Sequence, residues 1–192
     1  MTDSMPDSTA DARLSPTRRR RLVLLTVVAL AVLALDLWSK AWAWNNLRGQ
    51  RRIELVKDWL YFEFGFNTGA AFSFLAHTDW ARFVFIAISI GAIVYVVRMA
   101  VKLPTEKPSA FVAIGLVVAG VLGNLHDRLF RATDLGGGEL QHGVVDFIRV
   151  YYWPGKPWPI FNVADVALVA GVILLVLVMP KPVEPTPTLV PA

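Results

Sequence analysis

The sequence predicts a membrane protein of the all-α class with a small β element, built as a four-helix transmembrane bundle. Two observations lead to this fold class. The 192-residue chain is 55% hydrophobic with a mean hydropathy of +0.51, which is too apolar for a soluble domain of this size. Its apolar residues also form blocks instead of alternating, and each block with its flanks approaches the ~20 residues that a spanning helix needs. The blocks are Leu22–Leu35 extended by Leu37–Trp44, Phe83–Val97, Ala110–Leu122 and Ile160–Met179.

The segment between the first two predicted helices contains the β element. The pattern from Trp59 to Phe66 indicates a strand, and the small residues from Asn67 to Ala71 indicate a Gly-containing turn after it. Such an extracytoplasmic platform, resting on the bilayer, suits an extended ligand such as a peptide. A plain aromatic hairpin at the membrane surface is the simpler alternative.

A second segment outside the helices precedes the fourth helix and reads GVVDFIRVYYWPGKPW, residues 143–158. Its Tyr and Trp residues suit a membrane–water interface. We therefore expect a short amphipathic helix at the outer surface, which carries Asp146 toward the bundle. An aspartate in a loop is usually only solvated, but Asp146 stands between the apolar Val145 and Phe147.

The helices define one domain, residues 18–180, between two tails. We expect residues 1–17 to be a disordered cytoplasmic tail and the Pro-rich residues 181–192 to be a second cytoplasmic tail. Lys and Arg gather before the first helix, between the second and third, and after the fourth, which places both termini in the cytoplasm. The net charge of +4 then reflects membrane topology and gives no support to nucleic-acid binding.

A cleaved signal peptide is an alternative for the first helix, with Ala-Trp-Ala at residues 41–43 as the cleavage site. The polar residues between Asp36 and Lys40 and the large Trp42 disfavour it. The chain has no cysteine, which excludes disulfides, thiol nucleophiles and cysteine-bound metals within it.

The polar residues of the predicted helices agree in depth. At ~1.5 Å per residue, Asp36 lies roughly 21 Å from the inner end of its helix, and Asn124 and Asp127 lie about 21 to 26 Å from the inner end of theirs. Asp165 lies about 7 or 8 Å below the outer face. Because the hydrocarbon core is ~30 Å thick, all four fall in its outer third. This agreement predicts a polar pocket that opens outward.

Two of these segments share a spacing, Asn124-x-x-Asp127 and Asn162-x-x-Asp165. Residues three apart share a helix face, so we expect each amide to lie beside its carboxylate. An asparagine can donate to a carboxylate and accept elsewhere, which satisfies groups that water cannot reach. Polar residues also hold helices together in membranes, but two pairs at one depth favour a functional site.

Two carboxylates in a partly dry site do not both ionise easily, so one can keep a proton while the other acts as a base. Such a pair can activate water toward an amide bond without a metal or a thiol. Depth alone pairs Asp127 with Asp165 as readily as it pairs Asp146 with Asp165. A carboxylate-and-amide metal site is a weaker alternative.

Two other classes of protein also place carboxylates in membranes. A small proton-coupled transporter or channel subunit uses them along an ion path. That alternative predicts polar residues through the whole depth, and the inner halves of these helices are nearly all apolar. The other class is a non-catalytic assembly factor whose carboxylates only pack helices.

Five motifs, in order, resemble the motif series of lipoprotein signal peptidase (signal peptidase II), and the resemblance covers roughly Leu22 to Met179. They are DLWSK (36–40), FNTGAAFSF (66–74), GNLHDR (123–128), GVVDFI (143–148) and FNVAD (161–165). The resemblance implies an aspartic endopeptidase of the bacterial inner membrane, with its site toward the periplasm. It implies a diacylglyceryl-modified prolipoprotein as substrate, cleaved just before the modified cysteine, with membrane lipid around it. It implies no cofactor, no metal and no obligate protein partner.

The same resemblance implies the roles of the motif residues. The catalytic pair matches Asp146 and Asp165, and Asp127 becomes a buried support, paired with Arg128 or with the amides. The other residues implied to bind substrate or to support the site are Asp36, Lys40, Asn67, Gly69, Asn124, Arg128, Asn162 and Ala164.

One segment departs from the family pattern. LFRATDLGGGELQH, residues 129–142, is longer than the family usually has before the GVVDF motif. It contains Gly136, Gly137 and Gly138, so we expect a flexible loop.

Overall fold

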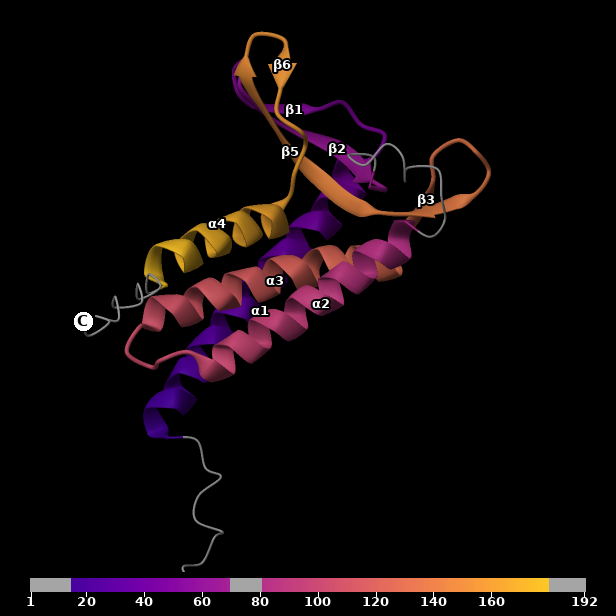
Figure 1. The fold of residues 1–192 in the computed structure, drawn as a ribbon. Coiled ribbons are helices and arrows are strands. Elements are labelled where there is room, and N and C mark those ends of the chain that lie inside the picture. The colour runs from indigo at the N-terminus through magenta and orange to yellow at the C-terminus, as the bar shows by residue number, and fades with distance from the viewer. Residues whose placement is uncertain (1–14, 70–80, 180–192) are drawn as a thin grey trace, which may run out of the picture.

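The computed structural model describes residues 15–69 and 81–179. Within them lie four helices, α1 (Pro16–Asn46), α2 (Ala81–Lys102), α3 (Pro108–Phe130) and α4 (Val163–Val178). Helix α3 packs against each of the other three, and the helices run side by side in Figure 1. The predicted tails 1–14 and 181–192 lie outside the described residues.

The first helix begins at Pro16, earlier than expected. The side chain of Ser15 accepts a hydrogen bond from the backbone N–H of Arg18, and a proline follows at the first helical position. Both features are typical of a helix start. Residues 16 and 17 of the expected tail therefore belong to the helix.

Three of the helices, α1, α2 and α3, are long and apolar enough to cross a membrane. The fourth predicted span is shorter than expected, because α4 has 16 residues, or about 24 Å of helix. The first residues of the apolar block do not join it. Phe161 pairs with Ile148 in an antiparallel bridge, and Asn162 then caps the helix.

Close packing of α3 against its neighbours depends on two glycines. A methyl group on Gly120 would lie 2.5 Å from the carbonyl oxygen of Ala164 in α4. One on Gly123 would overlap the carboxylate of Asp36 in α1. Small residues let helix backbones approach in membranes, and here they bring polar groups of three helices within hydrogen-bonding distance.

The β element is a four-stranded antiparallel sheet in the order β1-β2-β5-β6 at one end of the helices (Figure 1). Its strands are β1 (Ile53–Val56), β2 (Leu60–Asn67), β5 (Val144–Trp153) and β6 (Lys156–Pro157). The strand predicted from Trp59 to Phe66 is thus confirmed as β2. Of the predicted turn after it, residues 70 and 71 lie outside the described part of the chain.

The expected amphipathic helix at residues 143–158 is wrong, because this segment forms β5 and β6. Its β-branched and aromatic residues fit a half-buried pleated surface. Residues 144–150 pair with β2, in a register that sets Val144 opposite Asn67 and Asp146 opposite Gly65. Val145 and Phe147 are buried against the end of α1. Strand β5 therefore carries Asp146 directly over the bundle.

The glycine-rich insertion forms a second hairpin, β3 (Ala132–Asp134) and β4 (Leu140–His142), where we expected a flexible loop. Asp134 Oδ1 accepts three backbone hydrogen bonds, from Gly136 at 2.7 Å, Gly137 at 3.0 Å and Gly138 at 3.1 Å. These donors hold the pKa of Asp134 below its ordinary value. The carboxylate thus ties the glycine run into a closed turn.

Candidate active site

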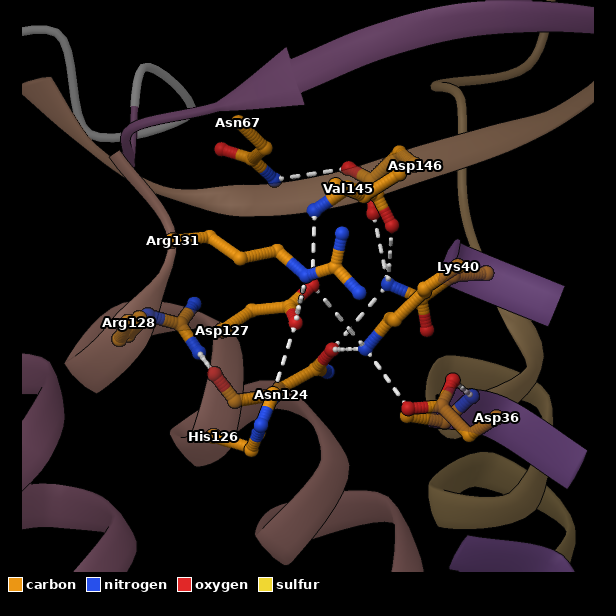
Figure 2. Close-up of polar contacts among 12 residues, drawn as sticks. Asp36, Lys40, Asn67, Asn124, His126, Asp127, Arg128, Arg131, Val145 and Asp146 are labelled. Carbon is orange, nitrogen blue, oxygen red and sulfur yellow. Dashed lines mark hydrogen bonds and ion pairs between the residues drawn. The ribbon is translucent and has the colours of Figure 1, made fainter. Parts of the chain in front are cut away.

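A layer of polar side chains lies where the helices meet the sheet (Figure 2). It draws on α1, α3, β5 and α4. Five of its side chains are almost completely buried, with exposures of 0 or 1%. They are Asp36, Lys40, Asp127, Asp146 and Asn162. Hydrogen bonds and ion pairs connect these groups, so they lie together in one layer of the structure.

Lys40 occupies the centre of the layer. Its Nζ lies 2.8 Å from Asp36 Oδ2, 2.9 Å from Asn124 Oδ1 and 3.7 Å from Asp127 Oδ2. The Asp36–Lys40 pair spans one helical turn, as its spacing predicts. Burying such charges is costly unless they are paired and hydrogen-bonded, so this cation holds two acids in the apolar bundle.

Asp127 links the end of α3 to the sheet. Its Oδ2 accepts a hydrogen bond from the backbone N–H of Val145 at 3.0 Å, next to Asp146. Its Oδ1 lies 2.7 Å from Nε of Arg131 and 3.3 Å from Nδ1 of His126. We expected Asp127 to pair with Arg128 or with the amides, but its arginine partner is Arg131. Sequence reasoning missed Arg131, although its four-residue spacing from Asp127 is a signal for such a pair.

Asp146 is held by two amides from different elements. Asn162 Nδ2 donates to its Oδ1 at 2.7 Å, and Asn67 Nδ2 donates to its Oδ2 at 3.2 Å. Burial, reinforced by the negative charge of Asp165, raises the pKa of Asp146 to about 7. The two amide donors favour the ionised form but do not offset burial. Both the protonated and the ionised form of Asp146 are therefore accessible near neutral pH.

Asp165 forms a reciprocal cap with Asn162 at the start of α4. The backbone N–H of Asp165 donates to Asn162 Oδ1 at 3.0 Å, and the backbone N–H of Asn162 donates to Asp165 Oδ2 at 3.1 Å. This capping box satisfies two N–H groups that a helix start leaves unpaired. Because Asn162 also donates to Asp146, one residue holds both carboxylates.

The other predicted amide–carboxylate pair, Asn124 with Asp127, is wrong. Asn124 does not donate to Asp127, three residues on, but to Asp165 Oδ1 across the α3–α4 interface at 2.8 Å. Its Oδ1 accepts from Lys40 and from Asn162 Nδ2, the latter at 3.1 Å. The three-residue spacing did not predict the hydrogen-bond partner of Asn124, because that partner lies on the neighbouring helix α4.

Three other predicted site residues occupy different places. Ala164 is fully buried, and its backbone N–H donates to Asp36 Oδ1 at 2.8 Å, which joins α1 to α4. Gly69 has a φ of +102° and donates its N–H to Asn67 Oδ1 at 2.9 Å, which orients the amide of Asn67. Arg128 donates to the backbone oxygen of Asn124 at 3.3 Å. In the described part of the chain it forms no ion pair within 4.0 Å.

The arrangement brings together two carboxylates of unequal character in a nearly dry layer. An acid with a raised pKa, such as Asp146, can donate a proton, and a neighbouring carboxylate can serve as the base toward water. Among residues 15–69 and 81–179, no three His, Asp or Glu side chains are grouped as metal ligands. The two carboxyl groups offer acid–base chemistry.

Known proteins are similar to this chain in sequence and in fold. The family model described as signal peptidase (SPase) II matches residues 28–181. A lipoprotein signal peptidase of Rhodococcus jostii is 37% identical over 182 residues, which cover 95% of this chain and 85% of the relative. One of Pseudomonas syringae pv. tomato is 37% identical over 172 residues, 89% of this chain and 93% of the relative. A solved structure described as a bacterial membrane enzyme has a TM-score of 0.68 and 29% identity, covering 83% of this chain and 94% of that one.

The apolar helices indicate an integral membrane protein, and the matching family model places the chain among the peptidases. Within that class, the chain belongs to the signal peptidase II family.

Proposed function

We propose that this protein is an aspartic endopeptidase that removes the signal peptide from diacylglyceryl-modified prolipoproteins, cutting just before the lipid-modified cysteine. Asp146 and Asp165 are the proposed catalytic pair. The observation that carries the proposal is their joint attachment to Asn162, combined with the pKa of about 7 at Asp146. The relatives named lipoprotein signal peptidase support the choice of substrate.

The unequal pair assigns the roles. Asp165 is the proposed base and accepts a proton from a water molecule whose oxygen bonds to the scissile carbonyl carbon, while Asp146 gives its proton to the carbonyl oxygen. The tetrahedral intermediate then loses its C–N bond. The leaving nitrogen takes the proton from Asp165, and Asp146 recovers a proton from a hydroxyl of the intermediate. Both carboxyl groups return to their starting states, so no other proton carrier is needed.

The supporting residues hold this pair in place. Lys40, Asp36 and Asp127 form the base of the layer, and the hydrogen bond from the N–H of Val145 to Asp127 holds β5 against α3. Asn67 and Asn124 each hold one catalytic carboxylate.

The proposed topology places both termini in the cytoplasm and the site near the periplasmic face of the inner membrane, with α4 completing a four-helix bundle. Lipid chains of the substrate would enter laterally between helices, and water would enter from the periplasm. The buried polar side chains of the described helices, Asp36, Ser39, Lys40 and Asp127, lie at this end, which supports a site in one layer. No observation favours the transporter alternative.

The test uses purified protein with a diacylglyceryl-modified prolipoprotein, and follows release of the signal peptide. We expect Asp146→Asn and Asp165→Asn to lose at least 10³-fold in rate, because neither amide can exchange the required proton. Glu139→Gln, which changes an exposed carboxylate outside the site, is the matched control and should cleave normally. Cleavage that persists in either folded aspartate variant would overturn the assigned pair.

A further inference from the structure

A cavity of about 700 Å³ is lined by residues of β2, β5 and the turns of the sheet. In Figure 1 this end of the sheet lies away from the helices. The cavity forms because β2 and β5 are neighbours, which sets two hairpin turns side by side: residues 57–59 between β1 and β2, and residues 154–155 between β5 and β6. The β5 residues that line it, Tyr151 to Trp153, follow Asp146 by five to seven positions. At ~3.3 Å per strand residue this separation is roughly 17 to 23 Å, so the cavity is distinct from the carboxylate site.

Aromatic rings form the walls of this cavity. Tyr61 and Tyr151 meet edge to face, with ring centroids 5.5 Å apart. Trp59, Tyr152 and Trp153 also line it and are 50 to 66% exposed. Large exposed aromatic residues gathered in one place indicate a contact surface, and Tyr and Trp in particular suit the headgroup level of a bilayer.

Two cations also line the cavity. The guanidinium of Arg52 lies 4.2 Å from the centroid of the Tyr61 ring and donates from Nη1 to the hydroxyl of Tyr151 at 3.0 Å. That bond uses one of its five N–H groups. Lys57 stands at the turn. In the described part of the chain neither cation forms an ion pair within 4.0 Å, so both are available to an anion.

The acidic residues of this end do not neutralise those cations fully. Residues 51–63 and 149–158 contain five basic and three acidic side chains. Glu63 pairs with Arg149 at 3.2 Å, and Glu54 Oε1 accepts from the backbone of Asp58 and from the hydroxyl of Tyr61. Asp58 lines the cavity too, which favours a singly charged anion over a highly charged one.

We propose that this cavity binds the phosphate of an anionic phospholipid headgroup in the outer leaflet, with Arg52 and Lys57 on the phosphate and the exposed Trp and Tyr rings among the headgroups. The two cations suit an anion, and the exposed aromatic rim favours a lipid over a soluble anion. The sheet projects beyond the helices (Figure 1), so in the proposed topology this end lies over the bilayer surface. Bound lipid would hold the sheet, and with it β5, against the membrane.

The test is a titration of the detergent-solubilised full chain with dihexanoyl phosphatidylglycerol, followed by tryptophan fluorescence, since Trp59 and Trp153 line the cavity. We expect saturable binding, at least tenfold tighter than that of dihexanoyl phosphatidylcholine. Arg52→Gln and Lys57→Gln should each weaken it about fivefold, the effect of one cation near a charged surface. Lys102→Gln, an exposed lysine at the far end of α2, is the control and should bind normally.

Each other result overturns the proposal. Equal affinity for the two lipids would remove the anionic specificity. Inorganic phosphate binding as tightly as phosphatidylglycerol would replace the lipid by a free anion. Lys57 is exposed, so Lys57→Gln should not disturb folding. Unchanged affinity in this variant would show that the lipid does not bind in this cavity. The measurement is of binding alone, so it stands or falls separately from peptide cleavage.

Discussion

Replacing Lys40 by methionine tests whether the buried charge layer holds the bundle together. Methionine keeps much of the volume of the lysine side chain and removes its charge. Lys40 is fully buried, and its Nζ lies 2.8 Å from Asp36 and 3.7 Å from Asp127, both also fully buried. The substitution therefore leaves Asp36 without its cation and removes one of the cations beside Asp127.

The expected loss of stability follows from the buried ion pair that Lys40→Met breaks. Removing one partner of a buried ion pair destabilises a protein by ~3–5 kcal/mol, mostly because the remaining charge stays buried without compensation. In proteins of 150–250 residues each kcal/mol lowers the melting temperature by about 2–4 °C. Lys40→Met should thus lower it by about 6–20 °C. Asn124 also loses a donor to its Oδ1, which places the effect toward the larger value.

The assay is thermal unfolding of the purified protein in one detergent, followed by tryptophan fluorescence. Lys102→Met changes an exposed lysine of α2 and should shift the melting temperature by no more than about 1–2 °C. Asp36→Asn added to Lys40→Met should restore a large part of the loss, because it removes the uncompensated acid. A Lys40→Met shift as small as that of Lys102→Met would refute the reasoning, and so would a double variant less stable than the single one.

Three further predictions concern the same layer. Burial raises the pKa of Asp146 from 3.8 to about 7, so the protonated carboxyl favours the folded state, and the free energy of unfolding should fall by about 4 kcal/mol as pH rises from 4 through 7. Unfolding measurements on Asp146→Asn should show a flatter dependence of stability on pH. Cleavage by the parent protein should decline above pH 7, because Asp146 then loses its proton. Arg131→Met removes the 2.7 Å bond to Asp127 and should cost about 1.5–3 kcal/mol in unfolding experiments, with Arg131→Lys recovering part; no loss would mean that the bond is dispensable. Gly123→Ala places a methyl group against the buried carboxylate of Asp36 and should destabilise the protein by about 1–3 kcal/mol in unfolding experiments. A methyl group at Gly91 meets nothing within 4 Å, so Gly91→Ala should not destabilise it. Equal effects of the two substitutions would contradict the packing argument.

The sequence predicted the polar layer because depth in a membrane helix is a local property. Position along a helix converts to depth at a constant rise, so Asp36, Asn124 and Asp165 could be placed together without knowing how the helices pack. The choice of partner is not local. Asn124 on α3 donates to Asp165 on α4 and not to Asp127 on its own helix. The periodicity of one helix shows which of its residues share a face, but not which neighbouring helix that face meets.

The sheet shows the same limit. Strand β2 was predicted from its own pattern, but β5 was expected to be a helix. The residues around Asp146 are apolar on both sides, a pattern that fits a buried strand or an interfacial helix equally. What decides is the pairing of Asp146 with Gly65, about 80 residues earlier in the chain, and no local pattern reports such a pairing.

The proposed site also has a consequence for how the protein comes into being. Asp36 on the first described helix accepts a hydrogen bond from Ala164 on the last one, and Asn162 on that last helix holds both proposed catalytic acids. During synthesis the earlier helices enter the membrane before α4 exists, with Asp36 lacking that partner and Asp146 lacking one of its two amides. An emerging chain would therefore be incapable of cleavage until its last described helix is in place, so that activity switches on with the completion of the bundle.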